Sequence, residues 1–179
     1  MRNVFFVLCC FAALLGCNKP KDEMAATPVV DATPPQVEIG DSKYADIGRQ
    51  GIAQLSSGDI DGWMTAFADN AKYYFNGGDS LVGKPAITSY WKERRGNVID
   101  KISFHNDVWT PLKINRPQKG PDQAGNWLLS WYQVSATYKN GKTMGQWIHT
   151  DFHFDANDKI DVVVQYIDRA PINAALAKK

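Results

Sequence analysis

The stretch of residues 58–91 limits the fold most strongly, because it predicts two helices with a strand hairpin between them. Its first helix has apolar residues at i, i+3, i+4 and i+7, the spacing of one buried helix face: Ile60, Trp63, Met64 and Phe67. Gly58 is typical of a residue that ends a preceding helix, and the Asp59 carboxylate can cap the helix that follows. Two consecutive helices are therefore expected around this junction.

The second half of the same stretch predicts the hairpin and the next helix. The aromatic run at 73–75 favours a strand, and Asn76, Gly77 and Gly78 end it in a turn. Pro85 suits the first position of a helix, and the residues that follow it at helical spacing are Ile87, Tyr90, Trp91 and Arg94. The stretch as a whole predicts the order helix, strand, turn, strand, helix.

The flanking segments complete an α+β pattern. A first helix is expected at 42–57, where Gly48 and Gly51 each cost about 1 kcal/mol relative to alanine; tight helix packing or room for a ligand would explain them. Further strands are expected at 99–114, 127–138, 144–154 and 160–167, with a loop at 116–125 and a short tail at 171–179. Helices followed by long antiparallel strands predict a curved, mostly antiparallel sheet wrapped over the N-terminal helices.

These motifs resemble the SnoaL-like group of the nuclear transport factor 2 superfamily. The resemblance is carried by Gly58, Asp59 and Trp63, by the segments 67–71 and 83–87, and by the late motifs within 154–168. It implies a cone-shaped α+β domain at 41–170, with a pocket at the mouth of the cone. It implies no single function, because the superfamily contains isomerases, dehydratases, cyclases and non-catalytic binders.

The N-terminus has the pattern of an export signal. Arg2 precedes an apolar run at 4–15 that is too short to span a bilayer. The run ends in Leu14-Leu15-Gly16-Cys17, which resembles the lipobox of bacterial lipoproteins. The resemblance implies a signal peptide at 1–16, a mature chain that begins at an acylated Cys17, and a lipid anchor in the bacterial cell envelope.

The residues after Cys17 indicate the location within the envelope more closely. Asn18 stands where inner-membrane retention signals usually have aspartate, which favours the outer membrane. The charged residues at 21–23 resemble short signals that send some lipoproteins to the cell surface. The remainder of 17–40 is rich in proline and has no apolar period, so we expect a disordered tether.

Composition excludes several classes of function. The chain has 20 Lys+Arg and 19 Asp+Glu, and loss of Arg2 with the signal peptide makes the two equal. Such a balance argues against a nucleic-acid partner, which requires clustered cations. All three cysteines lie at or before Cys17, so the domain has no disulfide, thiolate metal site or cysteine nucleophile. We expect no cofactor.

Two His/Asp groups are candidates for acid–base chemistry. His149, Asp151 and His153 alternate along one strand and therefore project from one face, whereas Ile148, Thr150, Phe152 and Phe154 form the better core face. His149 and His153 are about 13 Å apart at this spacing, too far to bind one metal ion together. His105 and Asp107 have the same alternation on an earlier strand and could act as general base and orienting group if both faced a cavity.

The family resemblance also indicates what the pocket contains. The ketosteroid isomerases of the superfamily use a carboxylate base, a tyrosine and a protonated aspartate, and these positions correspond here to Phe75, Gly51 and Thr150. Isomerase chemistry of that kind is therefore not expected. The same register predicts an aromatic and apolar ligand pocket: Trp63, Phe67, Tyr73, Phe75, Trp91, Thr150, Phe152, Val163, Gln165 and Ile167.

Three functional interpretations follow from the sequence. The first is a membrane-anchored, non-catalytic domain that binds a small apolar or aromatic ligand or acts as an envelope accessory protein. The second is an enzyme of the cyclase, isomerase or dehydratase type that uses His105, Asp107, His149 or Asp151. The third is a homodimeric protein-interaction module, which a sticky outer sheet face would favour.

Overall fold

The structure is a computed structural model that describes residues 33–118 and 123–177. These residues belong to one folded unit, Thr33–Lys179. The predicted signal peptide at 1–16, the lipidation site Cys17 and most of the predicted tether lie outside the described residues. None of the helices within the described ranges is long and apolar enough to cross a membrane.

Within these residues, seven strands form one sheet in the order β1-β4-β5-β6-β7-β2-β3. The strands are β1 (Val37–Ile39), β2 (Phe67–Phe75), β3 (Ser80–Val82), β4 (Ile99–Ile114), β5 (Gly125–Tyr138), β6 (Thr143–Phe154) and β7 (Ile160–Tyr166). The helices are α1 (Lys43–Ser57), α2 (Ile60–Met64), α3 (Lys84–Glu93), the π-helix η1 (Arg94–Val98) and α4 (Ala170–Leu176). All neighbouring strands are antiparallel except the parallel pair β2 and β7.

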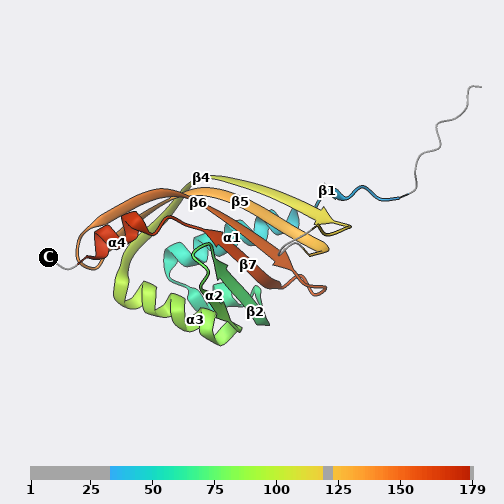
Figure 1. Cartoon of the computed structure of the whole chain (residues 1–179). Coiled ribbons are helices and arrows are strands. Elements are labelled where there is room, and N and C mark those ends of the chain that lie inside the picture. The colour runs from blue at the N-terminus through green and yellow to red at the C-terminus, as the bar shows by residue number, and fades with distance from the viewer. Residues whose placement is uncertain (1–32, 119–122, 178–179) are drawn as a thin grey trace, which may run out of the picture. The chain divides into compact units, whose positions relative to one another are not determined.

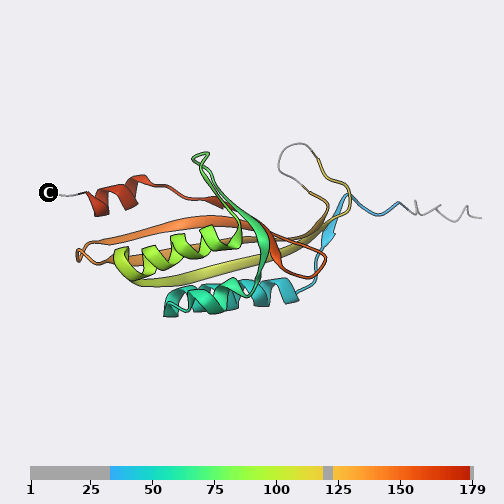
Figure 2. The same ribbon diagram turned by 90° about the horizontal axis from the view of Figure 1, so that it is seen from below.

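The sheet curves over the helices, as the sequence predicts. Figures 1 and 2 show the long strands β4, β5 and β6 arching over α1, α2 and α3, which lie on the concave side. Alternation along β5 and β6 gives the sheet two different faces, because successive residues point to opposite sides. The inward residues Leu128, Tyr132 and Phe152 are buried, whereas the outward Trp131 and Trp147 are exposed.

The junction between α1 and α2 has the predicted chemistry. Gly58 ends α1 with φ +86°, a left-handed conformation that glycine adopts without strain. The Asp59 carboxylate accepts a hydrogen bond of 2.9 Å from the Gly62 backbone N–H and so caps α2. The prediction that Phe67 belongs to this helix is wrong. Phe67 begins β2 instead, because the backbone around it pairs with Ile160 at the start of β7.

Two boundaries predicted from the sequence also need correction. The predicted tether extends to residue 40, but Val37–Ile39 pairs with β4, and the Asn115 side chain donates to the Pro35 carbonyl at 2.9 Å. Backbone pairing with a long edge strand orders these residues although their side chains are mostly exposed. The predicted tail at 171–179 contains α4, which has Pro171 in its first turn and buries Ile172 against the end of the sheet.

The glycines of α1 allow close packing. A side chain on Gly48 would collide with the Trp109 ring, and one on Gly51 would lie 2.8 Å from the Trp63 indole nitrogen. Helix packing therefore explains the two residues, and both also border the cavity described below.

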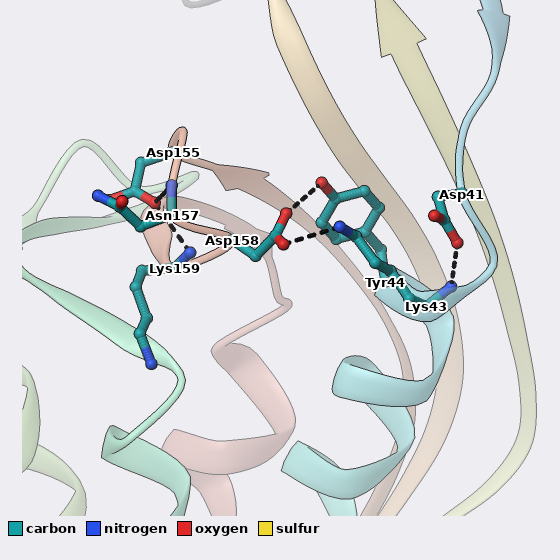
Figure 3. A network of polar contacts seen from close by, with 7 residues as sticks. All are labelled: Asp41, Lys43, Tyr44, Asp155, Asn157, Asp158 and Lys159. Atoms are coloured by element: carbon teal, nitrogen blue, oxygen red, sulfur yellow. Dashed lines mark hydrogen bonds and ion pairs between the residues drawn. The ribbon is translucent and has the colours of Figure 1, made fainter.

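Polar contacts fix α1 to the β6–β7 hairpin (Figure 3). Asp158 accepts hydrogen bonds from the Tyr44 hydroxyl at 2.6 Å and from the Lys43 ammonium at 2.7 Å. The Asp155 carboxylate accepts from the backbone N–H groups of Asn157 and Lys159 and so shapes the hairpin turn. Burial, followed by the bond to Asp158, raises the pKa of Tyr44 to about 12. The hairpin thus holds the N-terminal end of α1 against the sheet.

Candidate ligand cavity

A cavity of about 320 Å³ lies between the concave face of the sheet and the helices. Its wall is built from α1, α2, α3, α4 and the inward residues of the strands, and it is mostly aromatic and aliphatic. Trp63 and Trp91 pack edge to face with ring centroids 5.5 Å apart, and the ring centroids of Tyr73 and Phe75 are 4.9 Å apart. All four rings belong to the buried core cluster of the domain, so packing fixes their positions.

Seven of the ten residues predicted for the pocket line this cavity: Trp63, Tyr73, Phe75, Trp91, Phe152, Gln165 and Ile167. The other three, Phe67, Thr150 and Val163, are buried in the core and are not among the lining residues. Phe67 packs behind Trp63, with ring centroids 5.3 Å apart. Of the three positions that the family resemblance aligns with isomerase catalytic groups, Phe75 and Gly51 line the cavity, and Thr150 is hydrogen-bonded to the lining residue Tyr132.

Thr150 anchors a polar cluster at the cavity wall. Its hydroxyl lies 2.7 Å from the Tyr132 hydroxyl, and Gln165 Nε2 donates to it at 3.4 Å. Ser130 donates to the Thr150 carbonyl at 2.7 Å. Burial raises the pKa of Tyr132, and its hydrogen bonds oppose that shift. The cluster is satisfied internally and therefore keeps Tyr132 neutral and fixed.

Charged residues border the more exposed part of the cavity. Arg169 donates to the Asp79 carboxylate at 2.7 Å and lies 5.1 Å from the centre of the Phe75 ring. The Arg169 hydrogen bond lowers the pKa of Asp79. Arg94, where α3 passes into η1, lies 5.6 Å from the centre of the Tyr90 ring. The only carboxylate among the described lining residues thus has an arginine partner already.

The sequence pattern did not identify Asp79, Arg94 and Arg169 as residues of the cavity, although one signal was present. Arg94 continues the apolar stripe of Ile87, Tyr90 and Trp91, so the helical spacing already placed it on the inward side. Arg169 lies between the predicted strand at 160–167 and the predicted tail at 171–179, where no helix or strand was expected. Pro171, in the first turn of α4, is the residue that could have indicated the helix.

His149 and Asp151 lie on the outer face of the sheet, as their alternation predicts. The imidazole is stacked between Trp131 and Tyr166, with centroid distances of 4.5 and 5.5 Å, and its Nδ1–H donates to the Ser130 carbonyl at 2.9 Å. Nε2 is 2.9 Å from an Asp151 carboxylate oxygen, but that oxygen has no properly directed hydrogen bond within the described residues, so the contact is electrostatic. Burial raises the pKa of Asp151 above its usual value, and the nearby His149 opposes this rise only in part.

The other candidate acid–base residues also lie outside the cavity lining. His153 is buried and contacts the Asp161 carboxylate at 2.5 Å, and it does not join His149 and Asp151. His105 and Asp107 flank a bulge at Asn106, whose φ is +53°, and both are exposed. His105 contacts Ser103 at 3.1 Å, whereas Asp107 accepts from the Trp109 indole. The two do not form a pair. In the described ranges, no three His, Cys, Asp or Glu residues converge as metal ligands would.

Comparison with solved structures establishes the fold. A candidate polyketide cyclase from Xanthomonas campestris has 15% identity and a TM-score of 0.61, over 76% of this chain and 98% of that one. A candidate isomerase from Bacillus subtilis has 18% identity and a TM-score of 0.59, over 75% and 92%. An NTF2-like protein from Burkholderia pseudomallei has 13% identity and a TM-score of 0.59, over 77% and 100%. The domain has the NTF2-like fold expected from the sequence. No family model matches the sequence, and no curated protein does either.

Proposed function

We propose that this domain binds a small, largely apolar ligand in the cavity and does not transform it. The observation that carries the proposal is the cavity itself: about 320 Å³ of space walled by aromatic side chains within a well-packed fold. Most small-molecule sites are apolar hollows with a few polar groups that fix orientation. Here the Tyr73 hydroxyl and the Arg94 guanidinium belong to lining residues and have no hydrogen-bond acceptor within the described residues.

The rival proposal is an enzyme, since similar structures are described as candidate cyclases and isomerases. A general base must reach the proton that it removes. The described lining contains no histidine, and its one carboxylate, Asp79, is exposed and paired with Arg169. The His149–Asp151 pair is on the opposite face of β6. These positions favour binding without acid–base chemistry.

Fluorescence titration with 2-acetylnaphthalene tests the binding proposal. Saturable quenching is expected, because Trp63 and Trp91 line the cavity. Ala136→Leu adds bulk at a lining position and should weaken binding at least tenfold, whereas Ser135→Leu adds the same bulk on the outer face of β5 and should not. Equal binding by both variants would contradict the proposal.

Two further measurements distinguish a non-catalytic binding domain from an enzyme. His149→Ala and Asp151→Ala should bind 2-acetylnaphthalene like the wild type, since neither side chain lines the cavity. Isomerisation of a 3-oxo-steroid should stay at the buffer rate. Turnover above that rate would favour the enzyme.

We also propose that the chain is a lipoprotein anchored through Cys17 in the bacterial cell envelope. The proposed location is the outer membrane, and exposure at the cell surface is the alternative. Support comes from the apolar run that ends in Leu14-Leu15-Gly16-Cys17. Cys17→Ser should release the protein from the membrane fraction. Continued membrane association of that variant would contradict the anchor.

A homodimer is a second candidate role for the domain. Trp131, Trp147 and Tyr166 are 39%, 56% and 47% exposed on the outer face of the sheet, and exposed aromatic residues are enriched at interfaces. Sedimentation equilibrium of the wild type and Trp147→Ser tests this role. A wild-type dimer that the substitution dissociates would support it, and a wild-type monomer at all concentrations would exclude it.

A further inference from the structure

Arg94 borders the cavity without a counter-ion. The residue is half-buried where α3 passes into η1, and its guanidinium lies over the Tyr90 ring. Within residues 33–118 and 123–177 it has neither an ion pair nor a hydrogen-bond acceptor. A partly desolvated cation is unfavourable unless an anion or another hydrogen-bond acceptor binds it.

The neighbouring arginines show the contrast. Arg95 donates to the backbone carbonyls of Leu55, Ser56 and Ile99 at 3.0 to 3.1 Å, and it thereby ties η1 to the end of α1. Arg169 is paired with Asp79. Both have structural partners, so Arg94 is the cation of the described lining that has no partner of its own.

Uncharged donors accompany Arg94 along the cavity wall. Tyr73 and Tyr138 are each 2% exposed and line the cavity, and neither hydroxyl has a hydrogen-bond partner within the described residues. Burial raises the pKa of both tyrosines and the charge of Arg94 opposes that rise, which is consistent with a guanidinium close to both hydroxyls. With Arg94 and these two hydroxyls, the described lining offers three donor groups without acceptors.

We propose that the ligand is an organic carboxylate with a flat apolar body, whose carboxylate group binds Arg94. This inference rests on the proposed function of the cavity and specifies its ligand class. A carboxylate contributes acceptors only, which is what a wall of unpaired donors requires. Its planar oxygen pair also matches the guanidinium fork, so that two parallel hydrogen bonds can form. The apolar body then contacts Phe75, Trp91 and Phe152.

Isothermal titration with two probes of the same shape tests the inference: naphthalene-2-carboxylate and naphthalene-2-carboxamide. The full-length protein should bind the carboxylate about tenfold more tightly than the amide, because hydrogen bonds to charged groups are stronger. Arg94→Met should remove this preference and leave amide binding within about threefold. Arg94→Lys should restore part of it. Lys92→Met is the matched control, since Lys92 lies on the same helix and pairs with Asp61 outside the cavity.

The outcomes separate the two proposals. Equal affinity for both probes in the wild type, with both weakened by Ala136→Leu, would overturn the carboxylate inference and leave the cavity as the binding site. No binding of either probe would count against the proposed function and against this inference with it. Loss of both probes in Arg94→Met would mean that Arg94 supports the cavity wall and does not select the ligand.

Discussion

The two faces of strands β5 and β6 differ in the chemical groups that they carry. On the outer face His149 is stacked between two aromatic rings and has the Ser130 carbonyl and Asp151 as partners. On the inner face the strands are mostly apolar, and their polar residues Ser130, Tyr132 and Thr150 bond to one another. The unpaired Arg94 borders the same cavity from the end of α3. The His/Asp candidates thus lie away from the cavity, and the carboxylate in its described lining, Asp79, is paired with Arg169. For the proposed function, the face on which a residue lies therefore matters more than its type.

The largest expected effect compares one residue from each face of β6. Phe152 is 7% exposed and lines the cavity, so Phe152→Ala should lower the free energy of unfolding by about 3 kcal/mol and weaken ligand binding. Trp147 is 56% exposed, and Trp147→Ala should lower the free energy of unfolding by less than about 1 kcal/mol. Urea unfolding measures both. Equal losses would show that the outer face is buried in solution, as it would be in a dimer.

A smaller effect concerns the Asp151 carboxylate on the outer face. Because burial raises its pKa in the folded state, its favourable contribution is complete below the unfolded pKa and is lost as pH rises through the folded pKa. Asp151→Asn should therefore be more stable than the wild type at pH 7, by on the order of 1 kcal/mol. The difference should shrink towards pH 4. Urea unfolding at both pH values tests this, and a difference that grows on acidification would refute it.

The smallest effect concerns the edge of the sheet. A chain that begins at Asp41 lacks β1, whose Val37 and Ile39 are 39% and 81% exposed. Compared with a chain that begins at Thr33, its free energy of unfolding should be lower by about 1 kcal/mol, which corresponds to a few degrees of thermal midpoint. Ligand binding should be unchanged, because β1 does not line the cavity. Thermal unfolding and the titration above measure the two quantities. Altered ligand affinity would show that the edge of the sheet shapes the inner face.

Local rules predicted most of the fold. The Gly58 turn, the Asp59 cap and the alternation along β6 depend on neighbours in the chain, and the sequence displays those neighbours. Phe67 was misassigned because helical spacing favoured α2, whereas pairing with Ile160, far along the chain, places it in β2. Backbone pairing also orders Val37–Ile39, which has no apolar period.

The site was less predictable for the same reason. Alternation identified the inward residues, but it could not say whether an inward residue lines the cavity, as Phe152 does, or lies behind its wall, as Thr150 does. Nor could it show that Asp79 has Arg169 as a partner while Arg94 has none. Such distinctions depend on which elements meet in space, and the position of α4 decides several of them.

A crystal structure of the protein with naphthalene-2-carboxylate tests the central claim most directly. We predict density for the probe inside the cavity, with its ring system against Trp91 and Phe152 and its carboxylate within hydrogen-bond distance of Arg94. Density on the outer face beside His149 and Asp151, with an empty cavity, would contradict the account.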